Sequence, residues 1–96
     1  MTLEQLRKFK PQIQALAREY KIDPDSIRVF GSVARGEAEP NDIDLLVHLF
    51  PECDLLDFSG FTEEMQMLLC LKVDVVPDES VLPHIMPHAL RDAALL

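Results

Sequence analysis

The sequence predicts an α/β chain of the two-layer α+β type, with a small mixed β-sheet and helices packed on one face of it. Two observations predict this class. Apolar residues recur at helical spacing in the first twenty residues and again between residues 55 and 71. Short segments rich in β-branched residues alternate with these helices and end at glycine or proline. With 96 residues, the chain has room for one domain, spanning residues 1–96. The sheet face without helices is free to carry polar chemistry.

The first helical segment begins at a capping box formed by Thr2 and Gln5. Its apolar residues follow at three- and four-residue spacing from Leu3 to Tyr20. Pro11 removes a backbone donor within this segment, so we expect a kink there or a break into two helices.

The remaining elements follow from changes in spacing and from turn residues. We expect a turn at residues 23–25, a strand at 27–30, a loop at 31–41, a strand at 42–49, a helix at 55–71, a strand at 73–76 and a helix at 82–95. Gly60 weakens the expectation for the helix at 55–71 near its start.

The charge and the hydropathy pattern restrict the partners. The net charge is −8, so the chain alone is not expected to bind DNA or RNA directly. No apolar run approaches the roughly 20 residues of a membrane helix, and residues 1–10 lack the apolar core of a signal peptide. We therefore expect a cytoplasmic protein with no membrane partner.

Three aspartates form the candidate catalytic and metal-binding set. Asp42 and Asp44 are two residues apart on a predicted strand, so their side chains point the same way and repel unless a cation lies between them. Asp74 lies in the middle of a valine-rich strand, where a buried unpaired charge would be very costly. Val73 and Val75 are expected to face the core, so Asp74 is expected to face away from it, on the same side as Asp42 and Asp44. If these strands are neighbours, the three carboxylates form an all-oxygen site for two Mg²⁺ ions, or for Mn²⁺.

A candidate phosphate-binding turn directly follows the first strand. Gly31 allows the backbone to approach a ligand closely, and Ser32 offers a hydroxyl and a backbone N–H. Arg35 is near enough in sequence to reach a phosphate, although a solvated loop arginine is an equal alternative in isolation.

Together these segments resemble a known family. The run Gly31-Ser32-Val33-Ala34-Arg35-Gly36, followed by Asn41-Asp42-Ile43-Asp44-Leu45-Leu46-Val47 and by Asp74, resembles the signature of the polymerase-beta-like nucleotidyltransferase superfamily. More narrowly, it is similar to the minimal nucleotidyltransferases (MNT) that act as antitoxins beside HEPN toxins. Asn41 stands where the family often has serine.

The resemblance implies a nucleotidyltransferase fold and a role for each residue. Asp42 and Asp44 would bind both metal ions. Asp74 would bind the catalytic ion and help to deprotonate the acceptor, and Gly31 with Ser32 would hold the β- and γ-phosphates. The implied activity is Mg-dependent transfer of AMP from ATP, or from another nucleoside triphosphate, to a tyrosine hydroxyl of a HEPN toxin, which makes the chain an antitoxin.

The main alternative is a non-catalytic antitoxin that neutralises its partner by forming a complex. A glycosyltransferase fragment is disfavoured because the chain is too short and Asp74 would be unexplained. A polymerase is disfavoured by the acidic charge. The base, the acceptor, the number of nucleotides transferred and the oligomeric state, homomeric or heteromeric, stay open.

We do not expect any of the three histidines to be a catalytic or metal-binding residue. His48 follows Asp42 and Asp44 along the same strand face and is expected at the rim of the site. His84 and His88 are one helical turn apart, a spacing used by zinc sites, but nearby third and fourth ligands are lacking.

Overall fold

The computed structural model describes residues 1–31, 42–78 and 93–96. In these residues the chain forms helices and strands in the following order: α1 (Leu3–Arg7), α2 (Lys10–Glu19), β1 (Arg28–Phe30), β2 (Asp42–Val47), α4 (Leu55–Leu69), β3 (Lys72–Pro77) and β4 (Ala94–Leu95).

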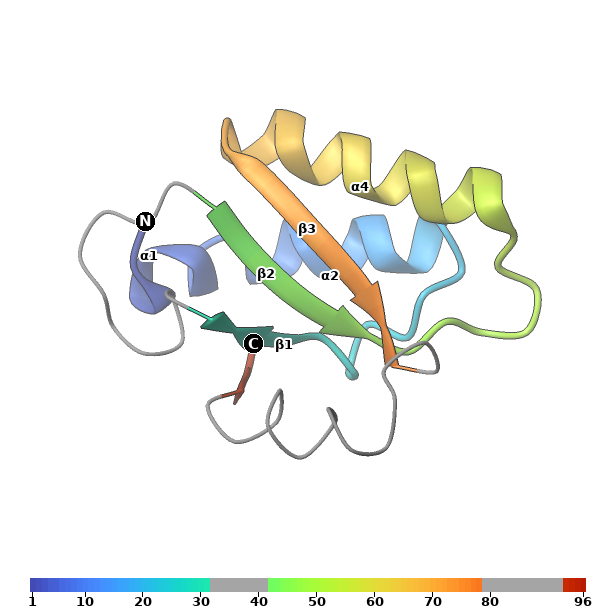
Figure 1. Cartoon of the computed structure of the whole chain (residues 1–96), viewed down its shortest axis with the longest axis horizontal. Coiled ribbons are helices and arrows are strands. Elements are labelled where there is room, and N and C mark those ends of the chain that lie inside the picture. The colour runs from blue at the N-terminus through green and yellow to red at the C-terminus, as the bar shows by residue number, and fades with distance from the viewer. Residues whose placement is uncertain (32–41, 79–92) are drawn as a thin grey trace.

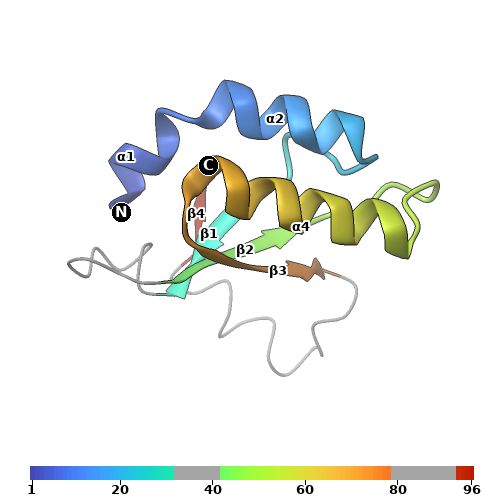
Figure 2. The same ribbon diagram turned by 90° about the horizontal axis from the view of Figure 1, so that it is seen from above.

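The four strands form one mixed sheet in the order β3-β2-β1-β4. β2 and β3 are parallel and are connected through α4, whereas β1 is antiparallel to both β2 and β4. The helices α1, α2 and α4 cover one face of this sheet (Figures 1 and 2). The predicted fold class, a small mixed sheet with helices on one face, is confirmed.

The core lies between the helical layer and the sheet. Alternate residues of the strands face the helices, and their side chains are almost completely buried: Val29, Ile43, Leu45, Val47 and Val73. The helices contribute their own apolar positions from the opposite side: Leu6, Ile13, Ala17, Phe61 and Met65. Because side chains alternate along a strand, this packing places the intervening residues on the opposite face of the sheet, where the described residues form no helix.

The two N-terminal helices form as the sequence predicts. In the capping box, the Gln5 backbone N–H donates to Thr2 Oγ1 at 3.1 Å, and the Thr2 N–H donates to Gln5 Oε1 at 2.9 Å. α1 ends at Arg7, and α2 begins at Lys10 with Pro11 in its first turn. A proline is tolerated there because first-turn N–H groups have no partner within the helix. The predicted interruption is therefore a break just before Pro11.

The helix α4 is held at its start by a second capping box. The Asp57 backbone N–H donates to Asp54 Oδ1 at 2.8 Å, and the Asp54 N–H donates to Asp57 Oδ2 at 3.2 Å. This second bond chiefly lowers the pKa of Asp57; burial raises the pKa, and Lys21, whose Nζ lies 3.4 Å from Oδ2, lowers it further. The charged form of Asp57 is therefore the one that the fold favours.

Asp57→Asn is expected to make the free energy of unfolding depend less on pH in the acidic range. A carboxyl with a lowered pKa stabilises the fold above its unfolded value, near 3.8, and this contribution is lost as the pH falls through the lower folded pKa. Urea unfolding of variant and wild type should therefore differ most near neutral pH and converge below about pH 4. Glu63→Gln, an exposed carboxyl of the same helix, is the control. A difference that stays constant with pH would contradict this origin.

Gly60 lies inside α4, where a glycine normally weakens a helix. A Cβ at this position would lie 2.6 Å from Cε1 of Tyr20, so the Tyr20 ring occupies the space that a side chain would need. The glycine therefore permits close contact between α4 and the end of α2.

Gly60→Ala is expected to destabilise the wild type and to stabilise the Tyr20→Ala background. Overpacking against the ring costs about 1–3 kcal/mol, which exceeds the gain of about 1 kcal/mol that alanine brings to a helix. Without the ring only the gain should remain. Urea unfolding of the wild type, the two single variants and the double variant measures the effect of Gly60→Ala on the free energy of unfolding with and without the Tyr20 ring. An effect of the same sign in both cases would contradict the explanation by overpacking.

The C-terminal prediction is partly wrong. Residues 79–92, which include most of the expected helix at 82–95, lie outside the described residues. Ala94 and Leu95, however, form β4 opposite Val29 and Arg28. The Leu96 N–H donates to Ile27 O at 3.0 Å, and the Leu96 side chain is buried. Here the free edge of β1 provides hydrogen-bond partners that helical spacing in the sequence does not reveal.

Within the described residues, no helix has the length and apolar character required to cross a membrane.

Candidate active site

The candidate site lies on the sheet face opposite to the described helices α1, α2 and α4. Asp44 and Asp74 are direct partners in the parallel pairing of β2 with β3, and Phe30 is opposite Asp44 on β1. Directly opposed residues on neighbouring strands are about 4.8 Å apart. The register therefore brings Asp44 and Asp74 side by side, as the sequence analysis expected.

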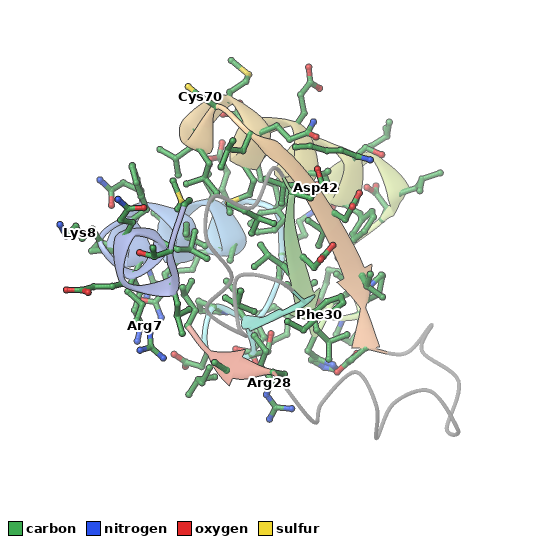
Figure 3. The ribbon with its side chains drawn as sticks, turned by 60° about the vertical axis from the view of Figure 1, so that its left-hand side comes forward. Arg7, Lys8, Arg28, Phe30, Asp42 and Cys70 are labelled. Carbon is green, nitrogen blue, oxygen red and sulfur yellow. The ribbon has the colours of Figure 1, made fainter. Side chains whose placement is uncertain are left out.

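Asp42 is the third aspartate of the set and lies two residues before Asp44 on β2. It shares the face of Asp44 because it is two residues away, at a rise of roughly 6.6 Å. Figure 3 shows Asp42 on β2 and both Phe30 and Arg28 on β1. The partner of Asp42 in the register is Lys72, which the sequence analysis did not single out. Lys72 is exposed and lies two residues before Asp74. Because residues two apart on a strand share a face, the sequence would have indicated that Lys72 lies beside the aspartates.

One argument from the sequence is wrong. Asp74 was expected to require a cation because a buried charge is costly, but its side chain is exposed, and no charged residue is buried in the described part of the chain. The placement away from the core was nevertheless right, since Val73 is buried beside it. What favours a cation is therefore the proximity of like charges rather than burial.

The donor set fits a hard divalent cation in part. Carboxylate oxygens from Asp42, Asp44 and Asp74 are the ligand type that Mg²⁺ and Mn²⁺ prefer. Among the described residues, however, no three acidic, histidine or cysteine side chains are close enough to form a metal site on their own. Mg²⁺ in proteins is commonly held by one or two carboxylates together with substrate phosphates. The three carboxylates therefore fit a divalent-cation site in which a bound triphosphate supplies the remaining ligands.

Asp42, Asp44 and Asp74 are called the acidic cluster below. Gly31 directly follows β1 and lies against Asp44 of this cluster. Its φ is +72°, in the left-handed region, and a Cβ at this position would overlap Oδ2 of Asp44 and lie 3.4 Å from its Cγ. Lys21 and Cys70 have similar φ values of 61° and 55° although each carries a Cβ. The need for glycine at residue 31 therefore comes mainly from Asp44. The other two predicted phosphate-binding residues, Ser32 and Arg35, lie outside the described residues.

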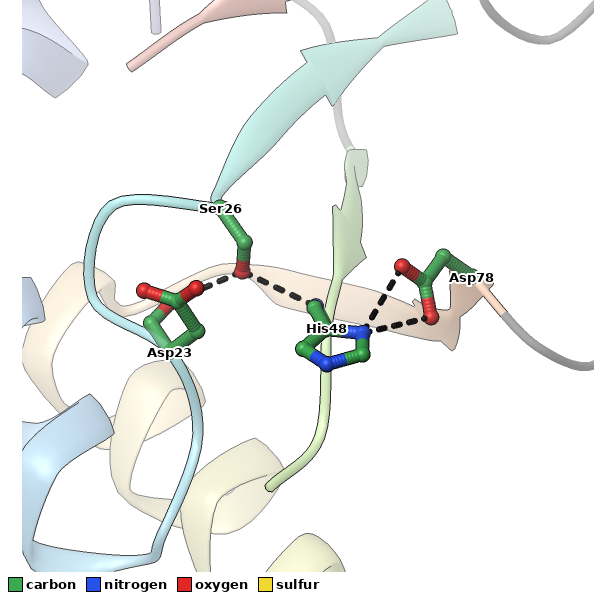
Figure 4. Close-up of polar contacts among 4 residues, drawn as sticks. All are labelled: Asp23, Ser26, His48 and Asp78. Carbon is green, nitrogen blue, oxygen red and sulfur yellow. Dashed lines mark hydrogen bonds and ion pairs between the residues drawn. The ribbon is translucent and has the colours of Figure 1, made fainter. Parts of the chain in front are cut away.

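The far end of this face carries a different polar group. His48 lies just beyond β2, and its Nδ1 is 3.1 Å from Oδ2 of Asp78 at the end of β3 (Figure 4). Its backbone N–H donates to Ser26 Oγ at 2.9 Å, and the Ser26 hydroxyl donates to Asp23 O at 2.7 Å. His48 is thus four residues from Asp44 and bonded to Asp78, a position at the rim rather than within the cluster.

The fold is that of the nucleotidyltransferase class of enzymes, and the sequence comparison agrees. The family model described as "Nucleotidyltransferase domain" matches residues 7–94. The chain belongs to this family and is a nucleotidyltransferase. The family generally uses divalent metal ions.

One relative of the chain has a more specific name. A candidate protein adenylyltransferase of Methanocaldococcus jannaschii is 37% identical over 79 residues, which cover 81% of this chain and 86% of the relative.

Solved structures agree with the fold. A structure described as a candidate minimal nucleotidyltransferase superposes with a TM-score of 0.84 at 37% identity, covering 100% of this chain and 97% of the other. A Shewanella oneidensis complex of a tri-AMPylated HEPN toxin with an MNT antitoxin includes a chain with a TM-score of 0.67 at 20% identity, covering 93% of this chain and 69% of that one. At that identity the second likeness concerns the fold alone.

Proposed function

We propose that this chain transfers AMP from ATP to a tyrosine hydroxyl of a HEPN-type toxin, with Mg²⁺, and thereby acts as its antitoxin. The observation that carries the proposal is the register of β2 with β3, in which Asp44 is the direct partner of Asp74 and Asp42 follows on the same face. The adenylyltransferase relative and the AMPylated HEPN complex favour AMP as the transferred group and a toxin as the acceptor.

The chain's own residues would bind the triphosphate and accept a proton. Gly31, whose lack of a side chain brings the backbone against Asp44, would let the turn with Ser32 approach the β- and γ-phosphates. Asp42, Asp44 and Asp74 would hold two Mg²⁺ ions, which activate the attacking hydroxyl and neutralise the leaving group. Arg35 would add a charge-assisted contact to a phosphate.

The reaction forms one bond and breaks one. The tyrosine oxygen would bond to the α-phosphorus, and the bond from that phosphorus to the oxygen bridging to the β-phosphate would break. Pyrophosphate would leave with that oxygen, and Asp74 would help to take up the hydroxyl proton. Asp74 suits this role because it is exposed at the edge of the cluster, where an acceptor can reach it.

The test is to incubate the purified chain with Mg²⁺, ATP labelled at the α-phosphate and the protein encoded by the adjacent gene. We expect label on that protein, and mass spectrometry should locate it on a tyrosine whose replacement by phenylalanine abolishes labelling. The proposal would be refuted if the wild type transfers no label and Asp42→Asn acts on the partner protein as the wild type does.

Neutralisation by complex formation alone is the competing function. It is distinguished by the variant in which Asp42, Asp44 and Asp74 are all replaced by asparagine, assayed for rescue of growth against the co-expressed toxin. Catalytic neutralisation predicts that rescue is lost although the two proteins still associate. Full rescue by this variant would assign the function to masking instead.

A further inference from the structure

A groove of about 470 Å³ lies between α2 and α4, on the helical side of the molecule. The helices cover one face of the sheet (Figure 2), and alternation along β2 and β3 places Asp44 and Asp74 on the other. A molecule bound in the groove would therefore leave the candidate active site open. The mechanism proposed above makes no use of this surface.

The groove combines an apolar lining with acidic residues. Ala15 and Leu16 of α2 and Met67 and Leu68 of α4 provide the apolar part, and Glu19 and Glu64 provide a carboxylate from each helix. Met67 is 68% exposed at the side of the groove. Methionine suits binding surfaces because its flexible thioether adapts to a partner.

The charge around the groove is negative and largely uncompensated at its Tyr20 end. The pKa of Tyr20 is raised, first by burial and then by Glu64, Glu19, Glu63 and Asp57, so the field of these carboxylates converges there. The neighbouring cation, Lys21, lies 3.4 Å from Asp57 and is already paired with it. Arg18 is exposed on α2 but does not line the groove.

We propose that this groove docks an amphipathic helix of a protein partner, with apolar residues in the groove and Lys or Arg residues against Glu19 and Glu64. Two adjacent helices form a groove that accepts the ridge of a third, and such helices anchor through apolar residues at i, i+3 or i+4, and i+7. Charge complementarity selects a basic partner. A second copy of this chain is disfavoured because its net charge is −8 and a symmetric contact would oppose glutamate to glutamate.

The probe is a designed helical peptide with leucines at i, i+4 and i+7 flanked by lysines, labelled for fluorescence anisotropy and added to the full chain. We expect the lysine peptide to bind and the same peptide with glutamates in place of the lysines not to bind. Met67→Ser and the pair Glu19→Lys/Glu64→Lys should each raise the Kd of the lysine peptide about tenfold or more.

Two matched controls separate the groove from the rest of the surface. Leu56 is 81% exposed on the same helix outside the groove, so Leu56→Ser should leave the Kd unchanged. Glu4→Lys/Glu52→Lys changes the net charge equally at exposed residues away from the groove, and should weaken binding much less. Equal weakening by both charge pairs, no binding of the lysine peptide by the wild type, or self-association of the wild type that Met67→Ser abolishes would overturn the proposal.

Discussion

Asp44→Asn is expected to reduce the rate of AMP transfer by about 10²–10³-fold while the fold is retained. Asp44 is the central member of the acidic cluster, between Phe30 on one side and Asp74 on the other. Metal stabilisation of transition-state charge is worth several kcal/mol, and each 1.36 kcal/mol is a factor of about ten in rate. The measurement is the initial rate of label transfer from ATP at saturating Mg²⁺, with the thermal midpoint recorded in parallel.

The matched control is Asp78→Asn. Asp78 is also a carboxylate next to this face of the sheet, but it pairs with His48 at the far end of β3. We expect this variant to transfer AMP at a rate close to that of the wild type. If Asp78→Asn and Asp44→Asn reduce the rate equally, the cluster around Asp44 is not the catalytic centre.

Gly31→Ala is expected to lower both transfer and stability. The left-handed backbone conformation costs an L-residue about 1–2 kcal/mol, and the added Cβ must also displace the Asp44 carboxylate that it overlaps. Displacement of a candidate metal ligand should reduce transfer by at least about tenfold, since positioning errors near 1 Å are costly in catalysis. Urea unfolding and the transfer rate measure the two effects separately.

Cys70→Gly is the matched control for backbone strain. Cys70 has φ 55° at the end of α4, is exposed, and lies two residues before β3 begins. Its replacement removes the same kind of strain, so stability should change by less than about 1 kcal/mol and transfer should not change. A Gly31→Ala variant that loses stability but retains full transfer would show that Asp44 tolerates the displacement.

Much of the fold could be predicted because local signals agree with the tertiary packing. The Thr2–Gln5 capping box, the break before Pro11 and the alternation from Asp42 to Leu45 each have a local cause, and each appears in the structure. β4 could not be predicted, because Ala94 and Leu95 become a strand only by pairing with β1, which is more than sixty residues away. The single-domain boundary at residues 1–96 stays a prediction.

The placement of the candidate site residues was predictable from their spacing, whereas the exposure of Asp74 was not, and their catalytic and metal-binding roles stay predictions. Spacing alone placed Asp42 and Asp44 on one strand face and Asp74 away from the core, and the register agrees. The argument from the cost of a buried charge at Asp74 was wrong because solvent accessibility depends on what covers this face of the sheet, which strand periodicity does not specify. The contact between Gly31 and Asp44 was also missed, since it depends on the antiparallel register of β1 with β2.

Counting bound Mn²⁺ by electron paramagnetic resonance, with and without a non-hydrolysable ATP analogue, tests the acidic cluster most directly because it requires no protein partner. We predict that the analogue promotes uptake of two ions per chain, since the triphosphate completes the ligand set. This uptake should be lost in Asp42→Asn/Asp44→Asn and retained in Asp78→Asn. Equal, nucleotide-dependent uptake of Mn²⁺ by wild type and the Asp42→Asn/Asp44→Asn variant would contradict the assignment of these residues as the metal site.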